Sequence, residues 1–411
     1  VAENIALGME RAPPPRALAR RISEVSQLYG LPLDPARTVG TLSAGERQRV
    51  EIVRCLLQEP RLLIMDEPTS VLTPQEAEIL FETLRKLAEE GTSILYISHK
   101  LEEIRALCDR ATILRRGQVV ARLDPRQSTA REMAEAMVGG AFAAPARAPR
   151  ETGEVVLEAR GLSLPAPGDF GTALREVSFA LRRGEVLGIG GVAGNGQEEL
   201  LAALSGERRA PRGTVLFQGR DVSALGPARR RALGLASAPE ERLGHAAVPE
   251  MSLTKNALLT AAATRGLARR GVIDWGATRR FAEDVIARFD VRTPGPEAAA
   301  RALSGGNLQK FVIGRELLQA PAALVVNQPT WGVDAAAAAA IRQALMDMAA
   351  AGAAVVAISQ DLDELMEIAD RFGALNGGRL SAVRPVGELD RERIGLMMGG
   401  AHDMEVAHVA E

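Results

Sequence analysis

The chain has 411 residues, 46% of them hydrophobic and 25% charged, and its net charge is −2. This length predicts two or three domains, and so small a net charge gives no general basic field for nucleic acid. The two cysteines are too few for a disulfide framework or a zinc cluster. No apolar run is long enough to span a membrane, and the first residues do not form a secretory signal.

Apolar runs and helical spacing alternate along the chain. In the first part, residues 61–67 and 93–99 read as strands on either side of a helix at 74–91. In the second part the predicted strands are 155–164, 174–181, 185–189, 323–327 and 354–359, and the predicted helices are 197–206, 278–290 and 307–319. Short β-branched runs of this kind are typical of buried parallel strands. The pattern therefore predicts an α/β fold with a largely parallel sheet.

The chain contains an internal repeat. LSAGERQRVEIVRCLLQEPRLLIMDEPTSVLT and LSGGNLQKFVIGRELLQAPAALVVNQPTWGVD align without a gap. One constant offset pairs Ser43 with Ser304, and it also pairs Gln48 with Gln309. Further pairs at the same offset run as far as Met137 with Met398. Such a register indicates two copies of one domain.

The repeat also predicts the domain boundaries. We expect residues 1–140 to be the rear part of the first domain, 141–153 to be an Ala/Pro/Arg-rich linker, 154–401 to be the second domain and 402–411 to be a tail. Asn4 and Asn256 align the copies near the amino end. That alignment places the front of the first copy, with its phosphate loop, before Val1, so the chain is expected to be an amino-terminally truncated fragment.

Two carboxylates end the apolar run RLLIMDEP. Asp66 and Glu67 stand where ligands gather in open α/β sheets, and a buried acidic pair is costly unless it binds a cation or handles a proton. Asp66 is suited to hold Mg²⁺ through water, and Glu67 to orient an attacking water or accept its proton. His99, after the next predicted strand, is suited to hold a terminal phosphate and that water. The alternative, an acidic strand end and a polar loop, does not account for LSAGE upstream.

LSAGERQ, LLIMDEP and ISH resemble, in order and spacing, the signature, Walker B and switch-histidine motifs of ATP-binding cassette (ABC) ATPases. The resemblance covers the whole chain and implies two tandem P-loop NTPase domains of the ABC type, the first incomplete, that use ATP and Mg²⁺. In that family the signature loop lies at a helix N-terminus and caps the ATP of the opposing domain. Ser43 and Gly45 take this place in the first copy, and Ser304, Gly305 and Gly306 take it in the second. A serine hydroxyl, glycine amides and a helix N-terminus together suit an anion.

The glycine-rich turn of the second copy departs from the phosphate-loop pattern G-x-x-x-x-G-K-[ST]. Its candidate nucleotide-binding residues are Gly191, Gly194, Asn195, Gly196 and Gln197. The glycines leave backbone amides able to cradle a phosphate. However, Gln197 stands where the lysine should be, and Glu198 replaces the hydroxyl that binds Mg²⁺.

Other catalytic groups are replaced in the same copy. Asn327 and Gln328 correspond to the two carboxylates, and Gln360 corresponds to the histidine. Each replacement keeps the approximate shape and removes a charge or an acid–base function. Glu240 takes the place of the family's glutamine. The second copy is therefore predicted to be catalytically inactive, and whether it still binds ATP stays open.

The resemblance implies one hydrolytic site per complete protein, because each ATP in this family lies between two domains. That site would combine Asp66, Glu67 and His99 of the first copy with Ser304, Gly305, Gly306 and Asp334 of the second. The other site would pair the degraded Gln197 loop with Ser43 and Gly45. The chain alone is expected to be nearly inactive as an ATPase, because the intact phosphate loop belongs to the front of the first copy.

Tandem copies with GVAGNGQ and DEPTSVLTPQE resemble the ATPase subunits of simple-sugar and nucleoside importers. The resemblance favours nucleosides, with ribose- or galactose-type sugars as the alternative. It implies transmembrane permease subunits as partners, an external substrate-binding protein acting indirectly, and a peripheral position on the cytoplasmic face of the inner membrane. Pairing of two complete chains stays open. A different class, a soluble tandem ABC ATPase outside transport, fits less well because the linker is short and one site is degraded.

Overall fold

A computed structural model describes residues 1–398 except Ser43, 70–71, Thr73, His99, Arg116, 139–151 and 169–170. The chain divides into two compact units, one built essentially from Val1–Phe142 and the other from the remaining residues. The predicted linker at 141–153 lies almost wholly outside the described residues, as does the tail at 402–411. Among the described residues, no helix combines the length and apolar character needed to cross a membrane.

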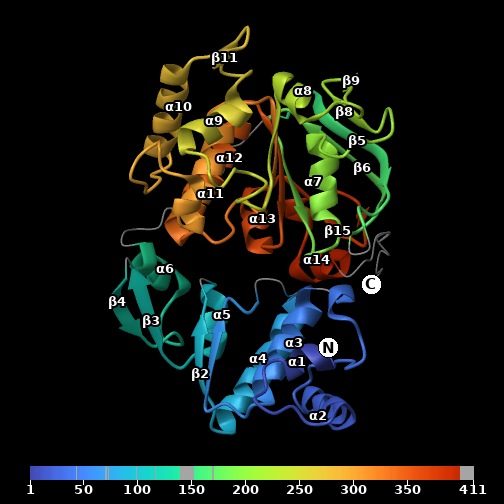
Figure 1. The fold of residues 1–411 in the computed structure, drawn as a ribbon, viewed down its shortest axis with the longest axis vertical. Helices are drawn as coiled ribbons and strands as arrows, with labels where there is room; N and C mark the ends of the chain where they lie inside the picture. Colours follow the sequence, from blue (N-terminus) through green and yellow to red (C-terminus); the bar gives the residue numbers. More distant parts are fainter. Residues whose placement is uncertain are drawn as a thin grey trace, which may run out of the picture. The chain divides into compact units, whose positions relative to one another are not determined.

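The first unit is an α/β layer (Figure 1). Its elements are α1 (Ala2–Ala6), α2 (Pro15–Leu28), α3 (Ala44–Leu56), β1 (Leu62–Asp66), α4 (Pro74–Glu89), β2 (Ser93–Ile97), α5 (Leu101–Leu107), β3 (Ala111–Arg115), β4 (Gln118–Leu123) and α6 (Ala130–Val138). Strands β1 and β2 pair in parallel, and β3 and β4 form an antiparallel hairpin. Helices α1 to α4 share a hydrophobic core that includes Ile22, Val53 and Leu84.

The second unit holds a larger set of elements. These are β5 (Val155–Leu164), β6 (Leu174–Arg182), β7 (Val186–Gly190), α7 (Gln197–Ser205), β8 (Val215–Phe217), β9 (Arg220–Asp221), α8 (Pro227–Ala232), β10 (Leu235–Ala238), α9 (Leu253–Ala261), β11 (Ala268–Arg269), β12 (Val272–Ile273), α10 (Trp275–Arg288), α11 (Gly305–Leu317), β13 (Ala323–Asn327), α12 (Ala335–Ala350), β14 (Ala354–Ser359), α13 (Leu362–Ile368), β15 (Arg371–Asn376), β16 (Arg379–Leu380), β17 (Arg384–Pro385) and α14 (Arg391–Met398).

The central sheet of the second unit has the strand order β10-β13-β14-β7-β15-β16, with β17 also paired to β15. The pairs from β10 to β15 are parallel, as predicted. A separate antiparallel sheet joins β6, β5, β8 and β9. Figure 1 shows this antiparallel sheet on one side of the unit and helices α9 to α12 on the other. Apolar residues of both sheets and of α7 form one core, which holds the strand ends in place.

The repeat found in the sequence extends to strand register. Leu62 lies opposite Ser93 in the first unit, and Ala323 lies opposite Ala354 at the equivalent positions of the second. Burial differs between the copies, because β13 lies between β10 and β14 and is buried throughout. The described part of the first unit has no counterpart of β7, β10 or α7, and residues along β1 are alternately exposed and buried.

Arg230 anchors the helix that follows the glycine-rich loop. This arginine is fully buried, and its guanidinium donates to the carbonyl oxygens of Ala203 and Leu204 at 2.7 Å each, at the end of α7. It also donates to the carbonyls of Leu225 at 3.0 Å and Ser223 at 3.1 Å. Burial lowers the pKa of Arg230 to about 10. The four acceptors replace the water that the cation lost.

Replacing Arg230 by Met should destabilise the second unit by roughly 3 kcal/mol, because several buried carbonyl groups lose their donor. Denaturant unfolding followed by circular dichroism measures the change. The neighbouring exposed residue provides the control, and Arg229→Met should stay within about 0.5 kcal/mol of the parent chain. Equal stabilities for the two variants would contradict the anchoring role.

Candidate functional site

The turn after β1 in the first copy and the turn after β13 in the second copy have the same strained backbone conformation. Glu67 has a φ of 47° and Gln328 a φ of 53°, which is left-handed backbone that costs a non-glycine residue on the order of 1 kcal/mol or more. The backbone N–H of Glu67 donates to the carbonyl of Ile97 at 2.9 Å, and that of Gln328 donates to Ile358 at 2.8 Å. Strain of this kind, present at the same position twice, is typical of functional turns.

The expected burial of the acidic pair is wrong for this structure. Asp66 is exposed and Glu67 is half-buried, whereas the corresponding Asn327 and Gln328 are buried. The reason is the smaller sheet around β1, which has β2 as its neighbour among the described residues. An exposed carboxylate pair at a strand end still suits a hydrated divalent cation, because Mg²⁺ usually keeps several waters.

The second-copy signature residues lie together at the start of α11. Ser304 is the N-cap, and its hydroxyl accepts from the side-chain amide of Asn307 at 2.9 Å. Gly305 and Gly306 form the first turn, where a side chain on Gly306 would press against the carbonyl of Gly332 at 3.3 Å. Ser304 and Gly305 are exposed, so this helix N-terminus lies at the surface, where an anion is favoured.

In the first copy only part of the corresponding turn is described. Gly45 lies in α3 and is buried against Glu76 and Leu72, at 3.1 and 3.3 Å from where a side chain would begin. Ser43 and His99 lie outside the described residues. Their assigned roles therefore stay predictions.

A glutamine links the signature helix to the strained turn in each copy. The Gln309 side-chain amide donates to the carbonyls of Gln328 at 3.0 Å and Pro329 at 2.9 Å. Gln48 makes the matching bond to the carbonyl of Pro68. Sequence reasoning used this glutamine pair only as a mark of the repeat. The same glutamine at the same repeat position in both copies was the signal that could have revealed the contact.

In each copy a serine that follows or ends a strand bonds to a glutamate in the next helix, and we call the segment between them the switch loop. The Ser359 hydroxyl donates to Glu364 at 2.8 Å and accepts from the N–H of Asp361 at 3.1 Å. In the first copy Ser98 accepts from the N–H of Lys100 at 3.0 Å and lies 3.3 Å from Glu103. In the second copy these contacts flank Gln360 and fix the backbone on both sides of it.

The glutamate of this pair was also missed by sequence reasoning. In the first copy Glu103 also accepts from the hydroxyls of Thr69 at 2.5 Å and Tyr96 at 2.7 Å. The matched motifs ISHKLEE and ISQDLDE hold a glutamate at the same repeat position, and that agreement was the available signal.

In the glycine-rich loop of the second copy, the side chain of Gln197 folds back and bonds to the backbone of the same loop. The backbone N–H of Asn195 donates to the side-chain oxygen of Gln197 at 3.0 Å, and Gln197 is buried. Gly194 and Gly196 have φ values of 84° and 110°, which glycine adopts without strain. The Asn195 side chain accepts from the N–H of Gly377 at 2.8 Å, which ties the loop to the sheet edge. The buried glutamine thus occupies a donor that a phosphate would need.

The charges around this loop do not suit a nucleotide with Mg²⁺. Burial raises the pKa of Glu240, and the nearby Glu198 carboxylate raises it further. The Asn327 amide donates to Glu240 at 3.4 Å, while its side-chain oxygen is buried with no partner among the described residues. Arg242 offsets part of this negative charge, but the loop has no lysine for the phosphates and carries Glu198 in place of the hydroxyl that binds Mg²⁺. No chemical step is therefore assigned to the second copy.

Asp334 has a structural role in this chain. It is the N-cap of α12, and its carboxylate accepts from the N–H of Ala337 at 2.9 Å. Such a cap stabilises a helix by about 1 kcal/mol. Its assigned role toward ATP stays a prediction.

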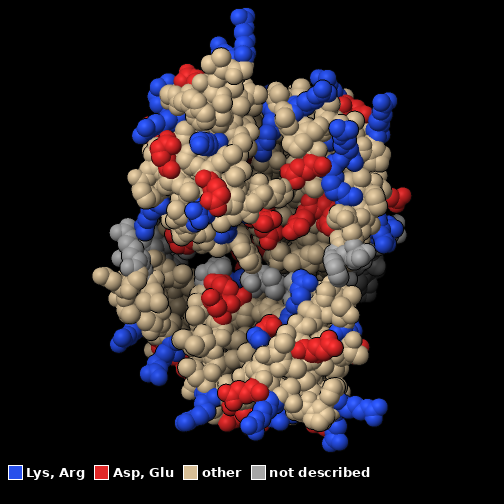
Figure 2. All heavy atoms as spheres, in the orientation of Figure 1, with Lys and Arg blue, Asp and Glu red and all other residues tan. Residues whose placement is uncertain are grey.

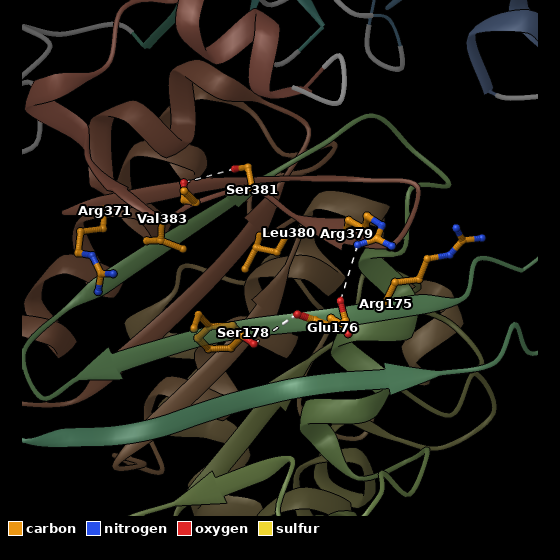
Figure 3. A pocket seen from close by; sticks show the side chains of 10 residues that line it. Arg175, Glu176, Ser178, Arg371, Arg379, Leu380, Ser381 and Val383 are labelled. Atoms are coloured by element: carbon orange, nitrogen blue, oxygen red, sulfur yellow. Dashed lines mark hydrogen bonds and ion pairs between the residues drawn. The ribbon is translucent and has the colours of Figure 1, made fainter. Parts of the chain in front are cut away.

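A hollow of about 460 Å³ opens on the second unit away from these residues (Figure 3). Arg371 and Arg379 stand on either side of Leu380 and Val383. Arg371 donates to Glu185 at 3.0 Å, and Arg379 lies 3.9 Å from Glu176. None of the predicted site residues lines this hollow, so it is not the candidate site.

The comparisons with known proteins agree with this geometry. The ABC transporter family matches residues 1–70 and 174–331, which is more than half of the chain. The chain is 40% identical over 388 residues to the glucose import ATP-binding protein TsgD13 of Haloferax volcanii, covering 93% of this chain and 70% of that protein. It is 36% identical to the guanosine import ATP-binding protein NupO of Bacillus subtilis strain 168, covering 98% and 80%.

Among solved structures, the fold resembles archaeal ribosome recycling factor aABCE1 in its complex with ribosomal stalk protein aP1. The TM-score is 0.65 at 19% identity, over 97% of this chain and 73% of that one. At this identity the likeness concerns the fold alone. The family and relatives decide the class: the chain belongs to the ABC transporter family. The predicted α/β fold with tandem ABC-type domains is confirmed.

Stability should depend on pH through Glu364. Burial, and then repulsion from Asp361, raises the pKa of this carboxyl from its ordinary value of 4.5 to about 7. A raised acid pKa means that the stabilising contribution is complete below about pH 4.5 and is lost as the pH rises to about 7. The loss is on the order of 3 kcal/mol. Thermal melts between pH 4 and 8 should show a flatter profile for Glu364→Gln than for the parent chain.

The matched control is Asp363→Asn, which changes an exposed neighbouring carboxylate. This variant should keep the slope of the parent chain. A Glu364→Gln variant with the same slope as the parent would contradict the assignment.

Proposed function

We propose that this chain is an ATP-binding subunit of an importer and that ATP is hydrolysed with the catalytic groups of its first copy. One observation carries the proposal. The strained turns at Glu67 and Gln328 have the same backbone geometry, but only the first copy has carboxylates there. Identical scaffolds with different chemistry favour one catalytic turn and one that serves as a partner.

The roles of the first-copy residues follow from their chemistry. Asp66 would hold Mg²⁺, which would offset charge on the phosphates of ATP. Glu67 orients the attacking water or accepts its proton, and His99 holds the terminal phosphate. The second copy supplies Ser304, Gly305 and Gly306, whose helix N-terminus suits phosphate oxygens, together with Asp334. A phosphate loop of the first copy is also required, and the printed sequence does not contain it.

The proposed role in an importer implies particular partner proteins and a location at the membrane. A chain that uses ATP for uptake needs transmembrane permease subunits, and it acts indirectly with an external substrate-binding protein. We place it peripherally on the cytoplasmic face of the membrane. Figure 2 shows acidic and basic side chains mixed across the visible face of the described residues, in keeping with protein partners rather than nucleic acid.

For the transported compound we propose nucleosides. The stretches SVLTPQEAEILFETL, VRTPGPEAAARALSGGNLQKF and QPTWGVD support this choice, and two relatives carry guanosine or nucleoside import in their names. Sugars are the second candidate, because other relatives are called glucose or ribose import proteins. Nothing in the chain itself is expected to contact the transported compound.

Reconstitution tests the function and the substrate together. The chain, joined to a segment that supplies a phosphate loop of the pattern G-x-x-x-x-G-K-[ST], is assembled with its permease in vesicles and given binding protein loaded with nucleoside or with ribose. We expect nucleoside to stimulate ATP hydrolysis and ribose not to do so. Glu67→Gln should lower kcat by roughly a hundredfold or more, the usual effect of losing a general base.

The same change from carboxylate to amide at an exposed position is the control, and Glu283→Gln should leave most of the activity. Stimulation by ribose alone would replace the substrate and keep the mechanism. Equal activity with and without permease and binding protein would speak against an importer.

A further inference from the structure

Arg242 links three segments of the second unit that lie far apart in the sequence. It lies on the loop after β10, close to Glu240. Its Nε donates to the side-chain oxygen of Gln309 in α11 at 3.0 Å. Another of its N–H groups donates to the backbone carbonyl of Trp331, in the loop after β13. One half-buried guanidinium therefore touches both the signature helix and the loop that follows the strained turn.

Two glycines make room for this guanidinium. A side chain on Gly305 would begin 2.6 Å from Nη1 of Arg242, and one on Gly332 would begin 3.0 Å from Nη2. The first distance is shorter than real contacts allow, so a side chain at position 305 would push the end of Arg242 out of its present place. Glycine at this position therefore leaves room for the guanidinium beside the signature turn.

Burying the Arg242 guanidinium costs free energy unless its N–H groups have acceptors. Burial lowers the pKa of Arg242, and the Glu240 carboxylate opposes that shift. The guanidinium also lies at the N-terminal end of α11, where the helix dipole disfavours a cation. The Gln309 oxygen, the Trp331 carbonyl and Glu240 offset these costs. Because Gln309 also donates to Gln328 and Pro329, the loops are joined in one network.

We propose that Arg242 is a positioning residue of the ATPase, which sets the signature turn at Ser304–Gly306 relative to the loop at Trp331–Asp334. This inference rests on the proposed function, in which both segments serve ATP hydrolysis. The planar fork of arginine reaches Gln309 and Trp331 at once, and a lysine ammonium, which has no such fork, does not. A displaced signature turn lowers the rate of the chemical step, because misplacement by about 1 Å costs up to a hundredfold.

The first experiment reads the contact directly, on the chain as it is. The sequence has two tryptophans, so Trp275→Phe leaves Trp331 as the only one. In that background Arg242→Ala should increase acrylamide quenching of Trp331 and shift its emission to the red, since the loop loses its anchor. Arg301→Ala is the matched control, an exposed arginine of the same region that pairs with Glu250 at 2.9 Å. Unchanged Trp331 emission in Arg242→Ala overturns the proposal.

The second experiment reads the rate in the reconstituted transporter. Arg242→Ala should lower kcat roughly tenfold or more with little change in KM, and Arg242→Lys should not restore it. Gly305→Ala should lower kcat as well, because it displaces the guanidinium. The double variant Arg242→Ala/Gly305→Ala should be no worse than the more impaired single variant, since both changes break the same contact.

The outcomes separate this inference from the proposed function. Full ATPase activity in Arg242→Ala, with a functioning parent protein, overturns the positioning role and leaves the function standing. Additive losses in the double variant overturn the shared contact. A parent protein without ATPase activity contradicts the proposed function, and the fluorescence result then still decides whether Arg242 holds the Trp331 loop. A melting temperature of Arg242→Ala as low as that of a core variant would make the role structural and also overturn the proposal.

Discussion

The strained turn that follows β1 in the first copy and β13 in the second is the constraint on which the positions of the signature helix and the neighbouring loops depend. Glu67 follows β1 and Gln328 follows β13, and both have left-handed backbone conformation. The backbone N–H of each donates to a carbonyl of the neighbouring strand. This bond fixes where the strand stops and the next loop begins. The side-chain amide of Gln309 then holds the carbonyls of the same turn from the signature helix. Strand end, signature helix and switch loop are therefore held in one arrangement rather than set by separate local preferences.

Duplication preserved this scaffold while the chemistry of the two copies diverged. Parallel strands pair in the same register in both units, and the serine and glutamate that hold the switch loop occur in both. In the second copy the glycine-rich loop has Gln197 where the phosphate-loop pattern has lysine, and the side chain of Gln197 accepts from the N–H of Asn195. The second unit remains well packed without these catalytic groups, because its core is made of apolar residues of the two sheets and of α7.

Local sequence patterns predicted the elements closely, and the differences have local causes. The strands at 323–327 and 354–359 have the predicted bounds, because short β-branched runs bounded by polar residues leave little choice. The helix expected at 278 begins at Trp275, since Asp274 caps it by accepting from the N–H of Ala277 at 2.8 Å. Similarly, the helix expected at 307 begins at Gly305, because Ser304 is its N-cap.

The sequence by itself determined the fold class, the repeat and the family, because these depend on residue order, spacing and short motifs. It also singled out Asp66 and Glu67 by their place at a strand end. Only the tertiary structure showed that Asp66 is exposed, that Gln197 folds back into its own loop, and that Arg242 touches Gln309 and Trp331. These features depend on contacts between residues far apart in the chain, or on which strands flank a given strand. Neither can be read from a local pattern, because packing is decided only when the whole sheet and its helices are assembled.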